Sequence, residues 1–122
     1  MKTSLAQKRQ GQIWLVDCNP SKGTEPGKIR PCLIVQTDAL NVNDPTSFLC
    51  LPLTSNIQPN SLLRERISKG ICGLQKDSTV IIDQLTALDH SRFVEVLDDG
   101  NLLPNDLMDT ILDKTETLFT RI

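Results

Sequence analysis

Residues 12–37 read QIWLVDCNPSKGTEPGKIRPCLIVQT, and this stretch holds two β-strand patterns on either side of a polar loop. In the first, Gln12–Cys18, apolar and β-branched residues predominate and alternate positions face opposite sides. The loop carries Pro26-Gly27, which suits a type II turn because proline fixes φ and glycine accepts a positive φ. Arg30-Pro31 opens the second strand, Cys32–Thr37, where the donor that proline lacks falls outside the ladder. The stretch therefore predicts a β-rich domain.

The middle of the chain predicts further short strands. Their patterns are Ser47–Thr54, Leu62–Ile67, Thr79–Asp83 (with Leu85–Leu88 as a candidate continuation of its sheet) and Phe93–Leu97. Asp38–Pro45 is a connection with room for one helical turn. Pro52 indicates that its strand lies at a sheet edge or contains a bulge, because proline cannot donate to a ladder.

The period of the apolar residues changes near the end of the chain. From Pro104 they recur at helical spacing, at Leu107, Met108, Ile111, Leu112, Thr115 and Leu118–Phe119. Pro104 suits a first helical turn, and Asp106 complements the helix dipole there. Several short strands followed by one amphipathic helix predict an α+β domain, mostly β, built as a small SH3-like barrel with a C-terminal helix.

The chain of 122 residues fits one compact domain, residues 1–122, without a separate cofactor module. Residues 1–10 are polar and basic, so we expect a polar N-terminal tail and not a secretory signal. No apolar run approaches the length of a membrane span. We therefore expect a cytoplasmic protein that makes no use of a membrane.

The charges are divided unevenly along the chain. The net charge is −2, but residues 1–76 carry ten Lys or Arg against five Asp or Glu, while residues 77–122 carry three against ten. The basic part, with a net charge of +5, could meet phosphates. Two solvated surfaces of opposite sign would give the same count, so charge alone does not decide between these interpretations.

Side chains that bind metals or act as bases are few and scattered. The four cysteines (Cys18, Cys32, Cys50 and Cys72) have no CxxC spacing, and we interpret them as buried free thiols in a reducing compartment. His90 is the single histidine and lies in a turn pattern, so we do not expect it to be a catalytic base. We expect neither a metal nor a cofactor.

Several polar residues stand where apolar strand patterns begin or end. Arg30 precedes the second strand, Thr54 ends the third, Asp83-Gln84 follow a buried run, and Glu25 lies in the first loop. Each has an ordinary structural explanation when taken singly, as a surface charge, a strand terminator or a cap. Composition and spacing alone favour those explanations.

Four ordered segments resemble the MazF/PemK toxins. The first segment has three parts. Gly11–Asp17 resembles the family's Gly-Asp-Ile-Trp-x-Val-Asp, and Asn19–Glu25 resembles its Gly-Ser-Glu loop. Arg30–Val35 resembles the Arg-Pro-x-Leu-Val-Val pattern that follows in the family. The other segments are the strand ending Pro52–Ser55, the Asp-Ser-x-Val-x-x-Asp-Gln strand Asp77–Gln84, and the Pro-x-Asp approach to the last helix in Asn101–Met108. The resemblance runs from about residue 11 to the end of the chain.

This resemblance implies a barrel of the CcdB/MazF type and a toxin of a type II toxin-antitoxin system. It implies a homodimer that cuts single-stranded mRNA without a metal, with a sequence preference, and that a cognate antitoxin inhibits. Arg30 and Thr54 match the family's catalytic pair, and Glu25 matches its loop carboxylate. Asp83 and Gln84 match positions that line the RNA groove in some members.

We also expect Ser55 and Lys28, which adjoin these positions, to bind the substrate. The sequence departs from the family in two places. The loop reads Glu25-Pro26-Gly27, where the family has Glu-Gln with its glycine one place later. PemK-type members also carry an arginine two residues before the aspartate, where this chain has Ile81, so Arg30 is expected to act as the cation alone.

The chemistry of RNA is consistent with these assignments. The ribose 2′-OH can attack the adjacent phosphate, which requires a base, an acid and charge stabilisation. Arg30 keeps its proton at neutral pH, so it suits binding of the phosphate oxygens and not proton removal. Thr54 can donate a hydrogen bond to the same phosphate. Glu25 is the first candidate for the base and Asp83 the second.

Two other functions compete with this one. CcdB-type gyrase poisons share the fold but end in Trp-Gly-Ile, whereas this chain ends Phe119-Thr120-Arg121-Ile122. A non-catalytic SH3-like module that only binds RNA is the third possibility. The aromatic content of 3%, with no tyrosine, argues against a surface that stacks bases on rings.

Overall fold

The computed structural model describes residues 7–18 and 29–121. Its strands are β1 (Ile13–Asp17), β2 (Ile29–Ile34), β3 (Ser47–Thr54), β4 (Arg64–Ile67), β5 (Ser78–Ile81), β6 (Thr86–Asp89) and β7 (Phe93–Val96). Its α-helices are α1 (Asp38–Asn41) and α2 (Asn105–Glu116), and 3₁₀ turns span Ile71–Gly73, Ile82–Gln84, His90–Arg92, Asp98–Gly100 and Thr117–Phe119. The α+β, mostly β domain expected from the sequence is confirmed.

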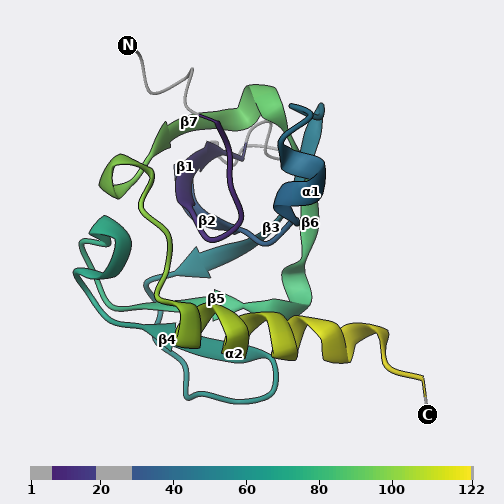
Figure 1. The fold of residues 1–122 in the computed structure, drawn as a ribbon. Coiled ribbons are helices and arrows are strands. Elements are labelled where there is room, and N and C mark those ends of the chain that lie inside the picture. The colour runs from purple at the N-terminus through teal and green to yellow at the C-terminus, as the bar shows by residue number, and fades with distance from the viewer. Residues whose placement is uncertain (1–6, 19–28, 122) are drawn as a thin grey trace, which may run out of the picture.

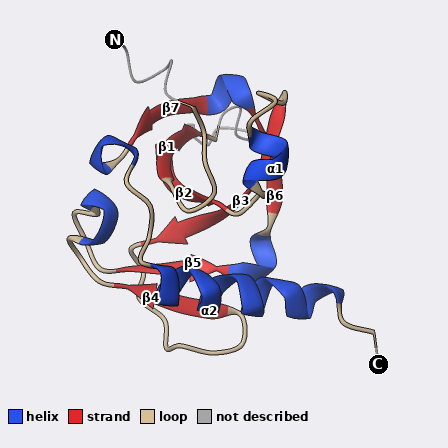
Figure 2. Cartoon of the chain, viewed as in Figure 1, coloured by secondary structure: helices blue, strands red, loops and turns tan. Residues whose placement is uncertain are grey.

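The strands form one antiparallel sheet in the order β4-β5-β3-β2-β1-β7, with β6 also paired to β3. β3 is central: Ser47–Cys50 pairs with β6, and Leu53-Thr54 pairs with β5. The sheet curls into an open, barrel-like form, with β1, β2 and β3 inside the curve and α2 across β4 and β5 (Figures 1 and 2). β3 thus joins the barrel to the layer that α2 covers.

Two apolar clusters form on opposite faces of the sheet. The barrel cluster is Trp14, Val16, Cys32, Ile34, Phe48, Cys50, Phe93 and Val96. Phe93 packs edge-on against Trp14, at 5.7 Å between ring centroids, and against Phe48 at 5.5 Å. The other cluster includes Ile13, Leu33, Leu51, Leu53, Val80, Met108 and Ile111 and lies beneath α2. Alternation along β1 to β3 fills both clusters, so both faces of these strands are buried.

The structure corrects the expected positions of the two strand prolines. β2 begins at Ile29 and ends at Ile34, so Pro31 lies within it, opposite Leu15 of β1. β3 is a central strand and not an edge, and Pro52 lies between the segments that pair with β6 and β5. Proline is tolerated at this position because neither β5 nor β6 pairs with it, whereas on the other side Cys32 of β2 lies opposite it.

The last strands also differ from expectation. β5 ends at Ile81, and Ile82–Gln84 forms a 3₁₀ turn instead of continuing the strand. The following segment, β6, continues the same sheet, as expected, because it pairs with β3, which also pairs with β5. The turn redirects the chain from the α2-covered layer to the barrel, which places Asp83 and Gln84 at a corner of the fold.

α2 begins after Pro104, carries Asp106 in its first turn, and buries Met108, Ile111 and Thr115, as the spacing predicts. Its Lys114 Nζ lies 2.6 Å from the Glu65 carboxylate and ties the helix to β4. The apolar pattern at the end of α2 does not all reach the core, because Phe119 is 68% exposed.

The cysteines are free thiols, and Cys32, Cys50 and Cys72 are buried, as expected. Cys18 is exposed, which corrects the expectation for that residue. The pKa of Cys32 is raised to about 12, mainly by burial and also by the nearby Cys18, and the Arg30 guanidinium opposes both effects. The Cys32 thiol therefore stays protonated at neutral pH and is not a nucleophile.

Candidate functional site

Arg30 and Thr54 lie on neighbouring strands, β2 and β3. The antiparallel register pairs Ile34 with Cys50 and ends with Cys32 opposite Pro52. If this register continued two residues past its last pair, Arg30 would lie level with Thr54 and on the same face. Both side chains are half-buried. The register therefore favours a cation and a hydroxyl on one face, near the ends of two central strands.

Hydrogen bonds fix the end of β3. The Thr54 Oγ1 accepts from the Asn56 backbone N–H at 3.1 Å, and the Oγ1 of its β5 partner, Thr79, accepts from the Gln58 N–H at 3.1 Å. The first bond closes the turn after β3, and the second holds the following loop against β5. In both, the hydroxyl is the acceptor, so its own hydrogen remains for another acceptor. Thr54 can therefore donate to a bound anion without loss of its loop contact.

Asp83 and Gln84 lie in the Ile82–Gln84 turn, and both are exposed. The Asp83 carboxylate accepts a hydrogen bond from Arg64 Nη1 at 2.8 Å. One carboxylate oxygen is thus committed to Arg64, whereas Gln84 presents its amide to solvent. Arg64 lies in the 62–67 strand pattern, and the alternation of apolar and charged residues there was the available signal for it.

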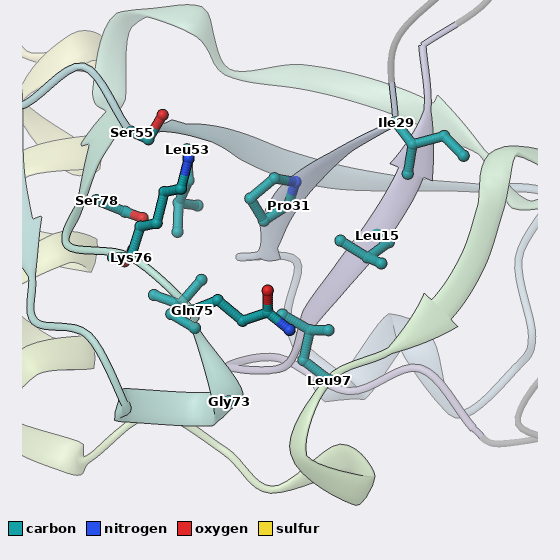
Figure 3. A pocket seen from close by; sticks show the side chains of 11 residues that line it. Leu15, Ile29, Pro31, Leu53, Ser55, Gly73, Gln75, Lys76, Ser78 and Leu97 are labelled. Carbon is teal, nitrogen blue, oxygen red and sulfur yellow. The ribbon is translucent and has the colours of Figure 1, made fainter.

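Ser55 lies apart from the Arg30–Thr54 pair. It lines a cavity of about 460 Å³ between the ends of β1, β2 and β3 and the segment 73–78 (Figure 3). The lining residues are Leu15, Ile29, Pro31, Leu53, Ser55, Gly73, Leu74, Gln75, Lys76, Ser78 and Leu97. Ile29 and Pro31 flank Arg30, and Leu53 and Ser55 flank Thr54, so the cavity and the pair lie on opposite faces. Glu25 and Lys28 lie outside the described residues.

Residues 7–18 and 29–121 contain no group of three or more His, Cys, Asp or Glu side chains that could hold a metal ion. In the same residues, no helix is both long and apolar enough to cross a bilayer. His90 is exposed in the 3₁₀ turn between β6 and β7. The neighbouring Asp89 carboxylate accepts from the Ser91 N–H at 2.9 Å and from the Ser91 hydroxyl.

The position of His90 leads to a negative prediction. Replacing His90 with alanine should leave any catalytic activity within about twofold of wild type, because the adjacent carboxylate caps the turn and does not orient the imidazole as a base. Rate measurements on the folded variant check this. A loss of activity with an unchanged melting temperature would instead indicate a histidine-based mechanism.

Comparisons with known proteins agree with the fold. The family described as "PemK-like, MazF-like toxin of type II toxin-antitoxin system" matches residues 9–119. A curated relative, Endoribonuclease MazF of Staphylococcus saprophyticus, is 34% identical over 90 residues, which are 73% of this chain and 74% of the relative.

Solved structures are similar over nearly the whole chain. MazE-MazF (Form-II) from Deinococcus radiodurans has a TM-score of 0.76 at 22% identity and covers 93% of this chain and 96% of its own. An endoribonuclease in complex with its cognate antitoxin, from a Mycobacterial species, has a TM-score of 0.69 at 17% identity and covers 92% and 94%. At these identities the structures establish the fold, and the family match extends over residues 9–119. This chain therefore belongs to the PemK-like, MazF-like toxin family of type II toxin-antitoxin systems.

Proposed function

We propose that this chain is the toxin of a type II system and an endoribonuclease that cuts single-stranded mRNA without a metal and with a sequence preference. The observation that supports the proposal most is the β2–β3 register, which would bring Arg30 level with Thr54 if continued two residues past the Cys32–Pro52 pair. Membership of the family and a 34% identical relative named as an endoribonuclease support it.

In this mechanism the nucleophile belongs to the RNA. The 2′-oxygen attacks the adjacent phosphorus, its proton passes to a base, and the bond to the 5′-oxygen of the next nucleotide breaks. The departing oxygen takes up a proton, so the products are a 2′,3′-cyclic phosphate and a 5′-OH. Arg30 stabilises the negative charge that builds on the non-bridging oxygens, and Thr54 donates a hydrogen bond to them.

The proton acceptor is assigned to a carboxylate. Glu25 is the first candidate, by its match to the family's loop carboxylate. Asp83 is the second, and its contact with Arg64 leaves one of its two oxygens for another partner. Replacement of each carboxylate by its amide would distinguish them, because only loss of the base should remove the acidic limb of the pH–rate profile, where protonation of the base slows the reaction.

Sequence preference requires polar groups that read base edges. We assign this role to Gln84 and Ser55, with Asp83 and Lys28 as further substrate-binding residues. Gln84 and Ser55 are exposed, and an amide and a hydroxyl can each both donate and accept hydrogen bonds. Ser55 lines the apolar cavity on the other face of the strands from Arg30 and Thr54, which offers a place for an unstacked base only if the RNA passes around the strand ends.

We further propose that the toxin works in the cytoplasm as a homodimer and is silenced by a cognate antitoxin. Two structural neighbours are named as complexes with MazE or with a cognate antitoxin, which supports an antitoxin here. The basic residues concentrated in residues 1–76 favour an acidic, partly disordered antitoxin segment that covers the RNA groove.

Such a segment gives a salt-dependent complex. Raising NaCl from about 0.05 to 0.5 M should weaken antitoxin binding at least tenfold, because exposed charge pairs are screened over distances of a Debye length. Titration calorimetry at several salt concentrations measures this, with RNA cleavage followed in parallel. A salt-insensitive complex that leaves cleavage untouched would argue for a different inhibitory surface.

One gel-based experiment tests the function itself. Purified protein is incubated with single-stranded RNA, and separately with gyrase and plasmid DNA. The proposal expects RNA fragments and no trapped gyrase–DNA complex, whereas a CcdB-like poison would give the reverse and a binding module would give neither. None of the relatives described above is named as a gyrase poison.

A further inference from the structure

Arg64 is held in place at the start of β4 by three acceptors. Its Nε donates to the Gln58 Oε1 at 2.7 Å, and its Nη1 donates to the Leu63 carbonyl oxygen and to the Asp83 Oδ1, both at 2.8 Å. Only 25% of the side chain is exposed. Because the guanidinium is planar, these contacts fix its orientation as well as its position.

The register places Arg64 on the same face of the sheet as Thr54. Thr54 pairs with Thr79, Thr79 pairs with Arg66, and Arg64 lies two residues from Arg66 on the same strand. The opposite face carries Glu65, which contacts Lys114 of α2. α2 therefore covers the face that Arg64 and Thr54 do not use. Two strand spacings and an offset of two residues along β4 put the backbones of Arg64 and Thr54 about 12 Å apart.

One edge of the Arg64 guanidinium remains available. Within residues 7–18 and 29–121, the structure records partners for Nε and Nη1 but none for the two N–H groups of Nη2. A groove of about 510 Å³ adjoins it, lined by Gln58, Pro59, Ser61, Leu62, Leu63 and Arg64. Leu62 is 62% exposed there. A fixed cation beside an open groove with apolar walls suits a nucleotide, which has a charged phosphate and a flat base.

We infer that Arg64 is a second phosphate-binding residue, positioned by Gln58 and Asp83, which binds single-stranded RNA next to the scissile phosphate. This inference rests on the proposed function and extends it. Arg64 pairs across β4 and β5 with Ile81, two residues before Asp83 in the chain. The fold thus supplies a cation from β4, two strands away from β3, and Arg30 does not act as the only cation of the site.

The contacts also assign a role to Asp83. Its carboxylate and the Gln58 amide hold two different nitrogens of one guanidinium. The Gln58 backbone N–H is in turn bonded to Thr79, the β5 partner of Thr54. Asp83 is therefore primarily a positioning residue for Arg64, and this chain of contacts links the Arg64 groove to the Thr54 end of β3.

The number of ions released on RNA binding tests the inference. For single-stranded nucleic acid, log K falls with log salt with a slope of about −0.7 for each phosphate neutralised. Binding is measured by fluorescence anisotropy between about 0.05 and 0.3 M NaCl. The probe is a single-stranded oligonucleotide in which every ribose is replaced by 2′-deoxyribose, so that it cannot be cut by 2′-oxygen attack. Arg64→Ala should reduce the magnitude of the slope by about 0.7.

Matched variants separate phosphate binding from a structural role. Arg64→Gln removes the charge with less loss of side-chain volume, and should lower the slope as Arg64→Ala does. Arg64→Lys keeps the charge, and should keep the slope. Arg9→Ala is the control, because Arg9 is ion-paired to Asp38 on α1, far from β4 in the fold (Figure 1), and should leave the slope unchanged.

Cleavage kinetics provide a second measurement. Arg64→Ala should raise KM by about tenfold while kcat changes by less than threefold, as expected for a group that binds ground state and transition state alike. The inference is overturned if folded Arg64→Ala and Arg64→Gln both keep the wild-type slope. Failure of the proposed function is detected separately, because the wild-type protein would then leave all-ribose RNA uncut.

Discussion

Replacing Arg30 with alanine is expected to lower the rate of RNA cleavage by about a hundredfold or more, the usual cost of removing one charge-stabilising donor. Arg30 lies on β2 opposite Val16 of β1, and the β2–β3 register, continued past its last pair, would bring it level with Thr54. Negative charge accumulates on the non-bridging oxygens only as the phosphate becomes five-coordinate. The loss should therefore fall on kcat, with a smaller effect on KM.

Arg30→Lys distinguishes geometry from charge. Lysine keeps the charge but has no planar fork for two phosphate oxygens, so it should restore little of the lost rate. The single tryptophan, Trp14, is fully buried and pairs with Cys32 of β2, so its fluorescence reports whether each variant keeps this part of the barrel. A folded Arg30→Ala protein that cuts RNA near the wild-type rate would show that the site is wrongly assigned.

Most of the fold could be predicted from the sequence because its signals are local. The strand patterns lie in residues that form β1, β3, β4 and β7, and helical spacing from Pro104 marks α2. The sequence could not predict that one half of β3 pairs with β6 and the other half with β5, because this depends on contacts with strands that are distant in the sequence. Pro52 carried the relevant signal, but a proline, which cannot donate to a ladder, is equally typical of an edge strand.

The site was less predictable from the residues themselves. Arg30 and Thr54 are 24 positions apart, and only the resemblance to a family singled them out from other residues at strand ends. The β2–β3 register now gives a physical reason to consider them together. Arg64 was missed because its role depends on contacts with Gln58 and Asp83, which become neighbours only when β4, β5 and the preceding loop assemble.

Cleavage is expected to continue in excess EDTA and to stop when the ribose on the 5′ side of the scissile phosphate is replaced by 2′-deoxyribose. The sequence has one histidine and no cluster of carboxylates or cysteines with metal-site spacing. The nucleophile is therefore assigned to the substrate. Removing the 2′-oxygen removes the attacking atom itself, so the rate should fall below detection while the oligonucleotide still binds.

The products and the preferred substrate follow from the same mechanism. One fragment should carry a 2′,3′-cyclic phosphate or its opened form, and the other a 5′-OH, which mass spectrometry and 5′-end labelling distinguish. Single-stranded RNA should be cut far faster than duplex, because attack requires the sugar edge to turn away from a paired helix. An oligonucleotide with deoxyribose at a different nucleotide is the matched control and should be cut. A 5′-phosphate product would mean that water attacks the phosphorus, and that Arg30 and Thr54 serve a different reaction from the one proposed.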